Sequence, residues 1–432
     1  MRILISELPK NIDKEVSVAG WIHKIRKLGG ISFVSLRDRS GIAQIVVEKE
    51  AHDLLRDLST ESVVKFFGKV KKEERAPLGA EILAEKVEII SPVKSEVPVE
   101  LNKKELRANL DTLLDNRPLT LRNPEQRAIF KIQSEMIRSF RDFLLGEDFT
   151  EIHSSKIVES GLETGGAEMF EVKWFENSAF LSQSPQMYKQ IMVGVYERVF
   201  ETAFAYRAEK HSTGRHLNEY LSLDLEIGFI ESHEDIMKLE EKMLNYIINH
   251  LNKTCKKEIN LIGAKLPKVP TKFPRLKLTE AQEILEKEYR EKCIGEPDLD
   301  PNQERLICEY AEKKWGSEFI FITHYPTKKR PFYTYDDPSD PKWTRSFDLM
   351  FRGIEITTGG QRLHLYKDYL KKMKDRGMNP ENFTDYLSVF KYGMPPHGGL
   401  AIGAERLVAK LLGLDNVREA SLFPRDIKRL KP

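Results

Sequence analysis

The sequence predicts an α+β protein in which a small N-terminal β-barrel precedes an antiparallel sheet flanked by helices. Five short segments with strand-like alternation occupy residues 14–90. Two later segments, 199–227 and 346–364, have the pattern of β-hairpins, and an amphipathic helix is expected from residue 124. Strands and helices that are segregated in this way are typical of α+β domains.

Composition limits what the protein can be. A length of 432 residues suggests two or three domains, and a net charge of +2 excludes a strong basic field, so any RNA binding must use local patches. No apolar run approaches the roughly 20 residues that span a bilayer, and the first residues lack the pattern of a signal peptide. The three cysteines are scattered without metal-ligand spacing. We therefore expect a reduced, cytoplasmic protein with no membrane association.

The N-terminal segments fit a five-stranded Greek-key barrel of the OB type, a common carrier of single-stranded nucleic acid. The expected strands are 14–22, 31–38, 41–48, 62–72 and 80–90, with a helical piece at 51–59. On the candidate binding face, Arg26 lies in a basic loop, Phe33 on the second strand and Gln44 on the third. An exposed Phe stacks a base while Arg and Gln read base edges, but Phe33 fits plain barrel core equally well.

Residues 91–106 are charged, contain proline and lack periodicity, as expected of a linker. After them, Asn123 and Pro124 supply a helix cap and a first-turn proline, and apolar residues then recur at helical spacing. The predicted division is a barrel domain at 1–103, a hinge or linker at 104–123 and a second domain at 124–432, within which 254–315 resembles an insertion without evident chemistry.

The hairpin at 199–227 has an unusually polar face. Leucines and an isoleucine of its second strand point one way, and the other face presents Tyr220, Ser222, Asp224 and Glu226. The loop between the strands carries Lys210, His211, Arg215 and His216. A solvated face of an antiparallel sheet is the simplest interpretation of one such strand, and the floor of a binding site is the alternative.

The hairpin at 346–364 is predicted to turn at residues 352–353, which pairs Asp348 with Thr357. Asp348 and Glu355 then lie on one face as diagonal neighbours, about 7 Å apart at Cβ. Two carboxylates at that distance can share Mg²⁺, whose other ligands are commonly substrate phosphates and water. The alternative is that both residues are ordinary surface acids. Their apolar neighbours in the sequence make this alternative weaker.

Four features stand in order along the chain. They are the barrel, an Arg-x-Glu pair at Arg207 and Glu209, the acidic hairpin, and a glycine-rich strand that ends in Gly-x-Glu-Arg at 403–406. This ordered set resembles the class II aminoacyl-tRNA synthetases with an N-terminal anticodon-binding barrel, and within them the aspartyl-tRNA synthetases of the archaeal and eukaryotic type. The resemblance covers essentially the whole chain. It implies a homodimer that uses ATP and Mg²⁺ to activate L-aspartate and transfer it to tRNA, giving AMP and pyrophosphate.

The resemblance also implies roles for individual residues. The implied catalytic residues are Arg207 and Arg406. The implied ATP site is Arg207, Glu209, Tyr220, Glu355 and Arg406, with Mg²⁺ on Asp348 and Glu355. The implied aspartate site is Glu163, Gln186, Lys189, Asp224, Thr358 and Arg362. The implied anticodon readers are Arg26, Phe33 and Gln44.

The chain departs from the family pattern in places. Tyr220 stands where Phe is usual, Ser154-Ser155 replaces the Thr-Pro of motif 1 near the dimer interface, and Glu163 lies one place early in the mobile loop. His23 and Pro77, expected in barrel loops, resemble enzymes that charge both tRNA-Asp and tRNA-Asn. That resemblance implies a partner that amidates Asp-tRNA-Asn.

Three other functions stay open. They are an asparaginyl-tRNA synthetase, a non-catalytic synthetase-like RNA-binding protein, and an ATP-dependent amide-forming enzyme on the same catalytic fold. Lys189 and Arg362 favour aspartate, because a neutral amide would leave two buried cations unpaired at a cost of several kcal/mol. The retained arginines and carboxylates argue against lost catalysis, and the barrel argues against an amide-forming enzyme.

Overall fold

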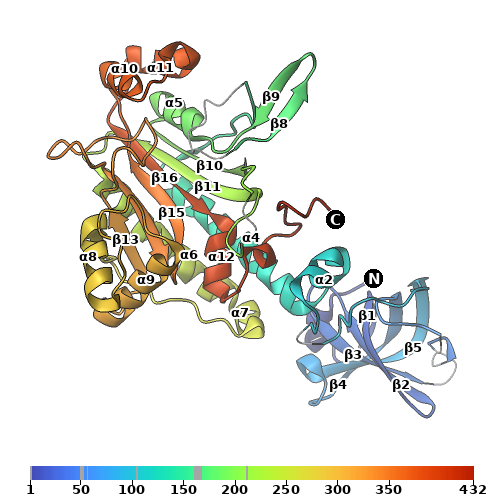
Figure 1. Cartoon of the computed structure of the whole chain (residues 1–432). Helices are drawn as coiled ribbons and strands as arrows, with labels where there is room; N and C mark the ends of the chain where they lie inside the picture. Colours follow the sequence, from blue (N-terminus) through green and yellow to red (C-terminus); the bar gives the residue numbers. More distant parts are fainter. Residues whose placement is uncertain (1, 49–52, 56, 104–105, 160–167, 211–212) are drawn as a thin grey trace. The chain divides into compact units, whose positions relative to one another are not determined.

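The computed structural model divides into two compact units, residues 1–124 and 125–432. The residues that it does not describe are 1, 49–52, 56, 104–105, 160–167 and 211–212. The first unit holds a closed β-barrel and the second a large sheet with its helices (Figure 1). The predicted α+β class, with a barrel followed by a largely antiparallel sheet, is confirmed.

Five strands close the barrel in the order β1-β2-β3-β5-β4. They are β1 (Glu15–Leu28), β2 (Ile31–Arg37), β3 (Ile42–Glu48), β4 (Val63–Lys72) and β5 (Ala80–Ser91), preceded by a 3₁₀ helix, η1 (Ile5–Lys10). Alternate residues fill the interior, as Val34 and Leu36 do on β2. Phe33 precedes Val34 in sequence, is only half-buried, and so is not part of the barrel core.

Two expected loop positions in the barrel are strand positions. Arg26 lies within β1, directly opposite Phe33, because the strand continues to a two-residue turn at Gly29 and Gly30. Gly29 has a φ of +58°, which such a tight hairpin turn requires. His23 lies at a bulge of β1, so its predicted loop placement is wrong too.

Other connections of the first unit contain a short 3₁₀ turn or short helices. Pro77 does lie in a connection, on the 3₁₀ turn η2 (Pro77–Gly79). The helix expected at 51–59 falls partly on residues outside the described part of the chain. The stretch 104–123, expected as a hinge or linker, contains α2 (Leu110–Asp115) and α3 (Arg117–Thr120).

An eight-stranded sheet organises the second unit, in the order β12-β13-β14-β15-β16-β11-β10-β6. Its strands are β6 (Thr150–Glu151), β10 (Arg198–Tyr206), β11 (Glu219–Gly228), β12 (Arg275–Lys277), β13 (Phe319–Thr323), β14 (Ser346–Phe351), β15 (Ile354–Gln361) and β16 (His397–Gly403). The inner strands pair antiparallel, and the edge strands β6 and β12 pair in parallel with their neighbours. A separate small sheet contains β7 (Ile157–Val158), β8 (Glu171–Trp174) and β9 (Asn177–Leu181).

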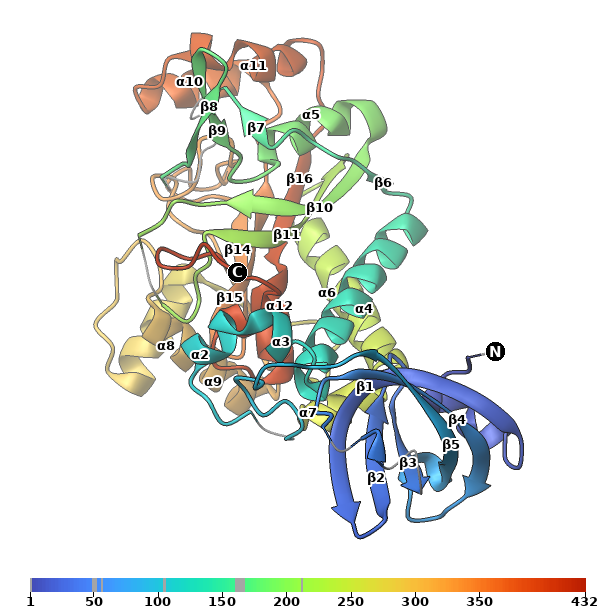
Figure 2. The ribbon, with the colours of Figure 1, turned by 90° about the vertical axis from the view of Figure 1, so that its right-hand side faces the viewer.

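Three helices bury the apolar side of this sheet. They are α4 (Pro124–Gly146), α6 (His233–Thr254) and α12 (Ala404–Leu412), and their apolar residues join Leu223 and Leu225 of β11 in one core. Helices α4 and α6 lie side by side (Figures 1 and 2), with His250 Nε2 2.9 Å from a Glu135 oxygen. The other helices are α5 (Gln186–Tyr196), α7 (Lys256–Ile262), α8 (Leu278–Tyr289), α9 (Pro301–Trp315), α10 (Tyr366–Asp375), η3 (Pro380–Phe383), α11 (Thr384–Lys391) and η4 (Val417–Ala420).

The polar face of β11 is buried rather than solvated. Ser222, Asp224 and Glu226 are 5%, 1% and 0% exposed. The interpretation of this strand as a wet sheet face is therefore wrong. Carboxylates this deeply buried need partners, because an unpaired buried charge is costly.

The β14–β15 hairpin turns at Arg352 and Gly353 as expected, but its register differs. A bulge between Leu349 and Met350 shifts the pairing by one residue, so Asp348 lies opposite Thr358 and not Thr357. Such an extra residue is invisible in a simple alternating pattern.

The region 254–315 is integrated into the second unit. Its strand β12 forms one edge of the large sheet, parallel to β13. Helix α9 places Glu304 against Arg215 and against the backbone N–H of Glu355. A segment without recognisable chemistry in the sequence therefore contributes a side chain close to the polar face of the sheet.

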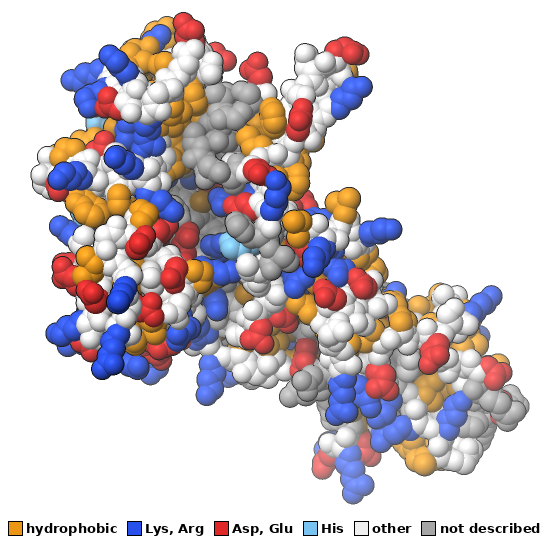
Figure 3. Space-filling view, viewed as in Figure 1, with side chains coloured by type: hydrophobic (Ala, Val, Ile, Leu, Met, Phe, Trp, Pro, Cys, Tyr) orange, Lys and Arg blue, Asp and Glu red, His pale blue; other side chains and the backbone are white. Residues whose placement is uncertain are grey.

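None of the described helices is both long and apolar enough to cross a membrane. Lysine and arginine side chains are intermixed with aspartate and glutamate over the visible face of the molecule (Figure 3), as the net charge of +2 indicates.

Candidate active site

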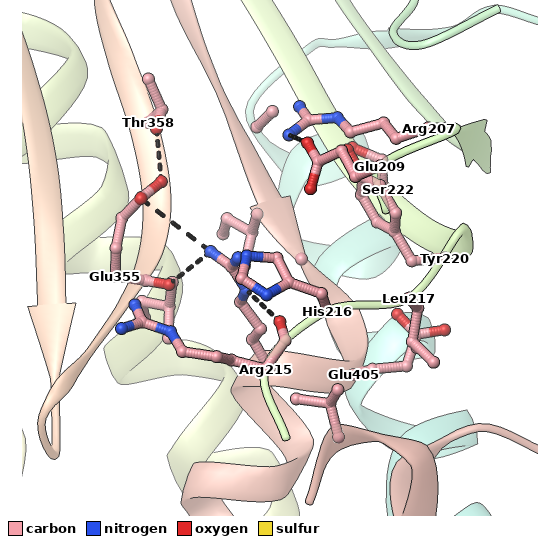
Figure 4. Close-up of a pocket in the computed structure, with 16 residues that line it drawn as sticks. Arg207, Glu209, Arg215, His216, Leu217, Tyr220, Ser222, Glu355, Thr358 and Glu405 are labelled. Carbon is pink, nitrogen blue, oxygen red and sulfur yellow. Dashed lines mark hydrogen bonds and ion pairs between the residues drawn. The ribbon is translucent and has the colours of Figure 1, made fainter. Parts of the chain in front are cut away.

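A pocket lies over the polar face of the sheet, between the β10–β11 hairpin, β15 and the start of α12. Its polar lining consists of Arg207, Glu209, Arg215, His216, Tyr220, Ser222, Glu355, Thr358, Glu405 and Arg406. Figure 4 shows Arg207 and Glu209 on one side, Glu355 and Thr358 across from them, His216 between the two groups and Arg215 below Glu355. The pocket thus gathers polar residues that are up to 199 positions apart in the sequence, from Arg207 to Arg406.

The Arg-x-Glu pair forms one wall. Arg207 Nη1 lies 3.9 Å from Glu209 Oε1, and its guanidinium lies 5.5 Å from the centre of the Tyr220 ring. Asn218, which the sequence did not single out, donates from Nδ2 to the carbonyls of Arg207 and Glu209 at 2.7 and 3.0 Å. This wall presents a cation, a carboxylate and an aromatic ring, groups that suit a phosphate, an exocyclic amine and a base.

Arg406 forms the facing wall from the first turn of α12. Its Nη1 donates to the Glu355 carbonyl at 3.0 Å, and its Nε donates to the Arg215 carbonyl at 3.3 Å. Arg215 itself pairs with the buried Glu304 of α9. Arg215 and His216 were recognised in the sequence only as a polar loop, and their place in the pocket lining was missed.

Asp348 and Glu355 influence each other electrostatically, as the predicted carboxylate pair should. Burial raises the pKa of Asp348 to about 7, even though Arg330 acts in the opposite direction. Burial also opposes ionisation of Glu355, but Arg406 and the Thr358 hydroxyl outweigh it and hold its pKa below the ordinary value. Burial therefore opposes the charge on Asp348, while the neighbouring groups favour the charge on Glu355.

The two carboxylates fit a hard cation. Asp348 Oδ2 accepts from Arg330, a residue the sequence did not indicate, while Oδ1 is buried and has no hydrogen-bond partner among the described residues. No group of three or more His, Cys, Asp or Glu arranged to hold a metal occurs within the described part of the chain. The pair matches the requirement of Mg²⁺, which commonly takes one or two carboxylates and completes its shell with phosphates and water.

A second, buried cluster adjoins the pocket through Ser222, whose hydroxyl donates to Asp224. Lys189 Nζ lies 2.9 Å from Asp224 Oδ1 and 3.4 Å from Glu226 Oε2. Arg362 Nε donates to Glu226 Oε1 at 2.9 Å, and its Nη2 donates to Gln186 Oε1 at 3.2 Å. The structure thus brings together four of the predicted aspartate-site residues, from α5, β11 and the position directly after β15.

Glu226 is the member of this cluster that sequence reasoning missed. It is fully buried between the two cations. Burial raises its pKa, but Arg362 and Lys189 outweigh burial and keep the pKa below the ordinary value. The prediction that a neutral ligand would leave Lys189 and Arg362 unpaired is therefore wrong, because both already have acidic partners. A ligand carboxylate must compete with Asp224 and Glu226 for these cations.

Two further residues were predicted for the aspartate site. Thr358 donates from Oγ1 to Glu355 Oε1 at 2.6 Å, which places its hydroxyl at the acidic side of the first pocket. Glu163 lies outside the described residues.

The segment where the family carries Thr-Pro is tied to β10. Ser154 donates to Glu201 from its backbone N–H and its hydroxyl, at 2.8 and 2.7 Å, and Lys156 lies 2.9 Å from the same carboxylate. Glu201 is 1% exposed. A buried, fully engaged carboxylate therefore fixes this short stretch in the absence of the proline.

The barrel brings its three predicted base readers onto one surface. Arg26 is paired with Phe33, and Gln44 is paired with Ser35, two residues along the same face of β2. Gln44 Nε2 donates to Glu81 at 2.8 Å, which orients its amide. These contacts describe one polar and aromatic surface on the outside of the barrel.

Comparisons with known proteins match a family model to each of two parts of the chain. A family model described as "tRNA synthetases class II (D, K and N)" matches residues 109–427, and one described as "OB-fold nucleic acid binding domain" matches residues 16–90. Together the two matches account for most of the chain, with the candidate active site in the first and the surface of Arg26, Phe33 and Gln44 in the second.

Relatives and solved structures match over the full length. The chain is 50% identical over 435 residues to the aspartate–tRNA(Asp/Asn) ligase of Thermus thermophilus, covering 100% of both chains. It is 46% identical over 425 residues to the aspartate–tRNA(Asp) ligase of Pyrococcus furiosus, covering 97% of this chain and 96% of the relative. The crystal structure of asparaginyl-tRNA synthetase from Pyrococcus horikoshii with asparaginyl-adenylate superposes with a TM-score of 0.93 at 34% identity, covering all of both chains.

The fold is thus shared by aspartyl and asparaginyl enzymes, and the higher sequence identity lies with the aspartyl relatives. The barrel, the Arg-x-Glu hairpin, the carboxylate pair and the full-length identity lead to one conclusion: this chain belongs to the class II aminoacyl-tRNA synthetases, in the family of aspartyl-tRNA synthetases with an N-terminal OB-fold domain.

Proposed function

We propose that this enzyme condenses L-aspartate with ATP to aspartyl-adenylate and pyrophosphate, and then transfers the aspartyl group to tRNA-Asp and also to tRNA-Asn. The observation that carries the proposal is the buried pair Lys189 and Arg362, which adjoins a pocket whose walls hold Arg207 and Arg406. Lys189 and Arg362 suit the carboxylate of a dicarboxylic amino acid, and Arg207 and Arg406 suit a polyphosphate.

In the first step an α-carboxylate oxygen of aspartate attacks the α-phosphorus of ATP, and the bond to pyrophosphate breaks. Arg207 binds the α-phosphate, Arg406 faces it from the other wall, and Glu209 accepts from the adenine amino group beside Tyr220. Asp348 and Glu355 would hold Mg²⁺, which supplies positive charge to the phosphates when bound. No covalent enzyme intermediate is needed, because positioning and charge stabilisation are the main sources of rate in phosphoryl chemistry.

The proposed amino-acid site uses the buried cluster. Asp224 and Gln186 accept from the α-ammonium group, and Lys189 and Arg362 donate to the side-chain carboxylate. An asparagine amide offers one acceptor oxygen and an NH₂ group that neither Lys189 nor Arg362 can accept from, whereas aspartate offers two acceptor oxygens. The resemblance adds Thr358, which lies at the acidic side of the first pocket, and Glu163, which lies outside the described residues.

The proposed enzyme accepts both tRNA-Asp and tRNA-Asn. One relative is named an aspartate–tRNA(Asp/Asn) ligase and another an aspartate–tRNA(Asp) ligase. In the barrel, His23 Nδ1 lies 3.3 Å from Arg37 Nη1. Since Arg37 can only donate, His23 accepts at Nδ1 and keeps its proton on Nε2. We propose that His23 and Pro77 admit the anticodons of both tRNAs, which Arg26, Phe33 and Gln44 contact. A partner amidotransferase would then convert Asp-tRNA-Asn.

Charging assays with purified tRNA-Asp and tRNA-Asn test this proposal. We expect aspartate to be attached to both tRNAs with kcat/KM values within about tenfold of each other, a difference of no more than about 1.4 kcal/mol. Transfer of aspartate to tRNA-Asp alone would contradict the relaxed choice and leave the aspartyl activity intact. A failure to charge either tRNA would contradict the proposed function itself.

The proposal also includes a cytoplasmic homodimer. Large apolar side chains stay exposed at the end of α4 and on β10, where Leu145 and Phe204 are 55% and 49% exposed. Surfaces of this kind are what a second copy covers in an obligate dimer. Sedimentation of the purified protein distinguishes a dimer from a monomer.

A further inference from the structure

A buried polar network lies behind the proposed aspartate site, and Gln190 is its centre. Gln190 is fully buried on α5, one helical turn after Gln186. Its Nε2 donates to Tyr369 Oη at 3.1 Å and lies 2.9 Å from His397 Nε2. Its Oε1 accepts from Gln186 Nε2 at 3.1 Å and from Tyr386 Oη at 3.0 Å. Both donors and both acceptor positions of the amide are therefore used.

The direction of every hydrogen bond in this network follows from Arg362. An arginine can only donate, so the atom of Gln186 that lies 3.2 Å from Arg362 must be its oxygen. The Gln186 amide nitrogen then points to Gln190, which must accept this hydrogen bond with its own oxygen. The Gln190 nitrogen in turn needs an acceptor at His397 Nε2, so the His397 proton is on Nδ1, 2.9 Å from the Pro395 carbonyl. Burial lowers the pKa of His397 to about 4, which agrees with a neutral ring.

Two tyrosines close this network into a ring. Gln190 donates to Tyr369, and Tyr386 donates to Gln190, so the remaining 2.9 Å contact has Tyr369 donating to Tyr386. The tyrosines belong to α10 and α11, which lie next to α5 in both ribbon views (Figures 1 and 2). Tyr369 and Tyr386 are 0% and 3% exposed. The α10–α11 segment therefore holds one amide of α5 in a single orientation.

This orientation matters for the side chain in front of it. With its nitrogen committed to Gln190, Gln186 turns its oxygen toward Arg362 and the proposed aspartate site. An oxygen is the end of the amide that an α-ammonium group requires. If the amide rotated, its NH₂ group would face both Arg362 and the ammonium, and the oxygens of Gln186 and Gln190 would face each other.

We propose that Gln190 is a positioning residue for amino-acid recognition, held by Tyr369 and Tyr386, and that it acts by fixing the amide of Gln186 and through it Arg362. The proposal rests on the proposed aspartate site. A buried network of this kind is stable only while every polar group in it has a hydrogen-bond partner. Removing one hydroxyl therefore weakens the other hydrogen bonds of the network. It gives the α10–α11 segment, which contributes no side chain to the first pocket, a part in substrate binding.

Gln190→Met tests the proposal, since methionine has a similar length and removes all four hydrogen bonds. In ATP–pyrophosphate exchange we expect KM for aspartate to rise about tenfold, with KM for ATP changing less than about twofold. Tyr386→Phe removes one hydroxyl and keeps the ring, and we expect a rise of about threefold in KM for aspartate. Tyr392→Phe is the matched control, because Tyr392 follows α11 but is 87% exposed. Its two KM values should equal those of the wild type.

A double-mutant cycle separates positioning from general stability. If Gln190 acts through Gln186, Gln190→Met should add little to KM for aspartate in a Gln186→Ala background. Additive effects would overturn the proposal. So would a lower melting temperature and a smaller active fraction with unchanged KM values, which is what a purely structural residue produces.

The same series tells the positioning role apart from the substrate assignment. Wild-type exchange with asparagine alone would reject the proposed substrate, and a KM shift for asparagine in Gln190→Met would still support the positioning role. Normal wild-type exchange with aspartate, combined with an unchanged KM in Gln190→Met, would reject the positioning role alone.

Discussion

Arg362→Ala should reduce aspartate-dependent pyrophosphate exchange by about 150- to 5,000-fold, since loss of one buried partner of an ion pair typically costs about 3–5 kcal/mol. The substitution removes a donor to the substrate carboxylate. It also leaves the fully buried Glu226 with Lys189 as its remaining cation in the cluster. Both effects act on the amino-acid site, so binding of ATP alone, measured by calorimetry, should be retained.

Arg305→Ala is the control for this experiment. Arg305 pairs with Glu309 on the surface of α9 and has a side chain that is 53% exposed. Exposed ion pairs contribute little, so exchange should stay close to the wild-type rate. Should Arg362→Ala fail to fold, Arg362→Lys keeps the charge but loses the planar fork, and a large loss is expected there as well. A folded Arg362→Ala protein with wild-type exchange would contradict the assignment of the aspartate site.

Gly399→Ala should also abolish activation of aspartate, although glycine has no side chain to contact a substrate. A Cβ at this position would lie 2.1 Å from the Leu225 carbonyl oxygen and 2.2 Å from Glu226 Oε2. Because Gly399 is paired with Glu226 across β16 and β11, the new methyl group must push the strand or the carboxylate aside. Overpacking typically costs about 1–3 kcal/mol, and displacing Glu226 breaks its contacts with Arg362. Thermal unfolding and pyrophosphate exchange would measure the two effects.

Gly146→Ala provides the matched control. Gly146 ends α4, has no heavy atom within 4 Å of the position that an alanine methyl group would take, and does not need a left-handed backbone. Both its melting temperature and its exchange activity should match the wild type. Wild-type activity in Gly399→Ala would show that the carboxylate of Glu226 can move without consequence, contrary to the tight packing of the buried cluster.

The sequence predicted the fold well where one periodicity dominates. The barrel strands and the β10–β11 hairpin follow simple alternation, and the helix α4 follows helical spacing. The β14–β15 register was wrong because a bulge beside Leu349 inserts one residue without changing the apolar pattern. Arg26 was misplaced because the basic segment before Gly29 resembles a loop in sequence, although β1 continues through it to Leu28.

The candidate site was predictable only in part. Arg207, Glu209, Asp348, Glu355 and Arg406 carry local motifs, and the structure places all of them around or beside the pocket. Glu226 was missed because an acid on a polar strand face looks solvated until Arg362, 136 residues away, is folded against it. Arg330 and Glu304 were missed for the same reason: their partners are brought to them by the sheet and not by neighbouring sequence.

ATP–pyrophosphate exchange by the wild-type protein, with aspartate and asparagine supplied separately, tests the central claim most directly. The buried Lys189 and Arg362 predict rapid exchange with aspartate and at least about a hundredfold lower kcat/KM with asparagine, a difference of roughly 3 kcal/mol that loss of one charge-assisted hydrogen-bonded pair can supply. Exchange that depends on asparagine, or that proceeds equally with both amino acids, would contradict the account.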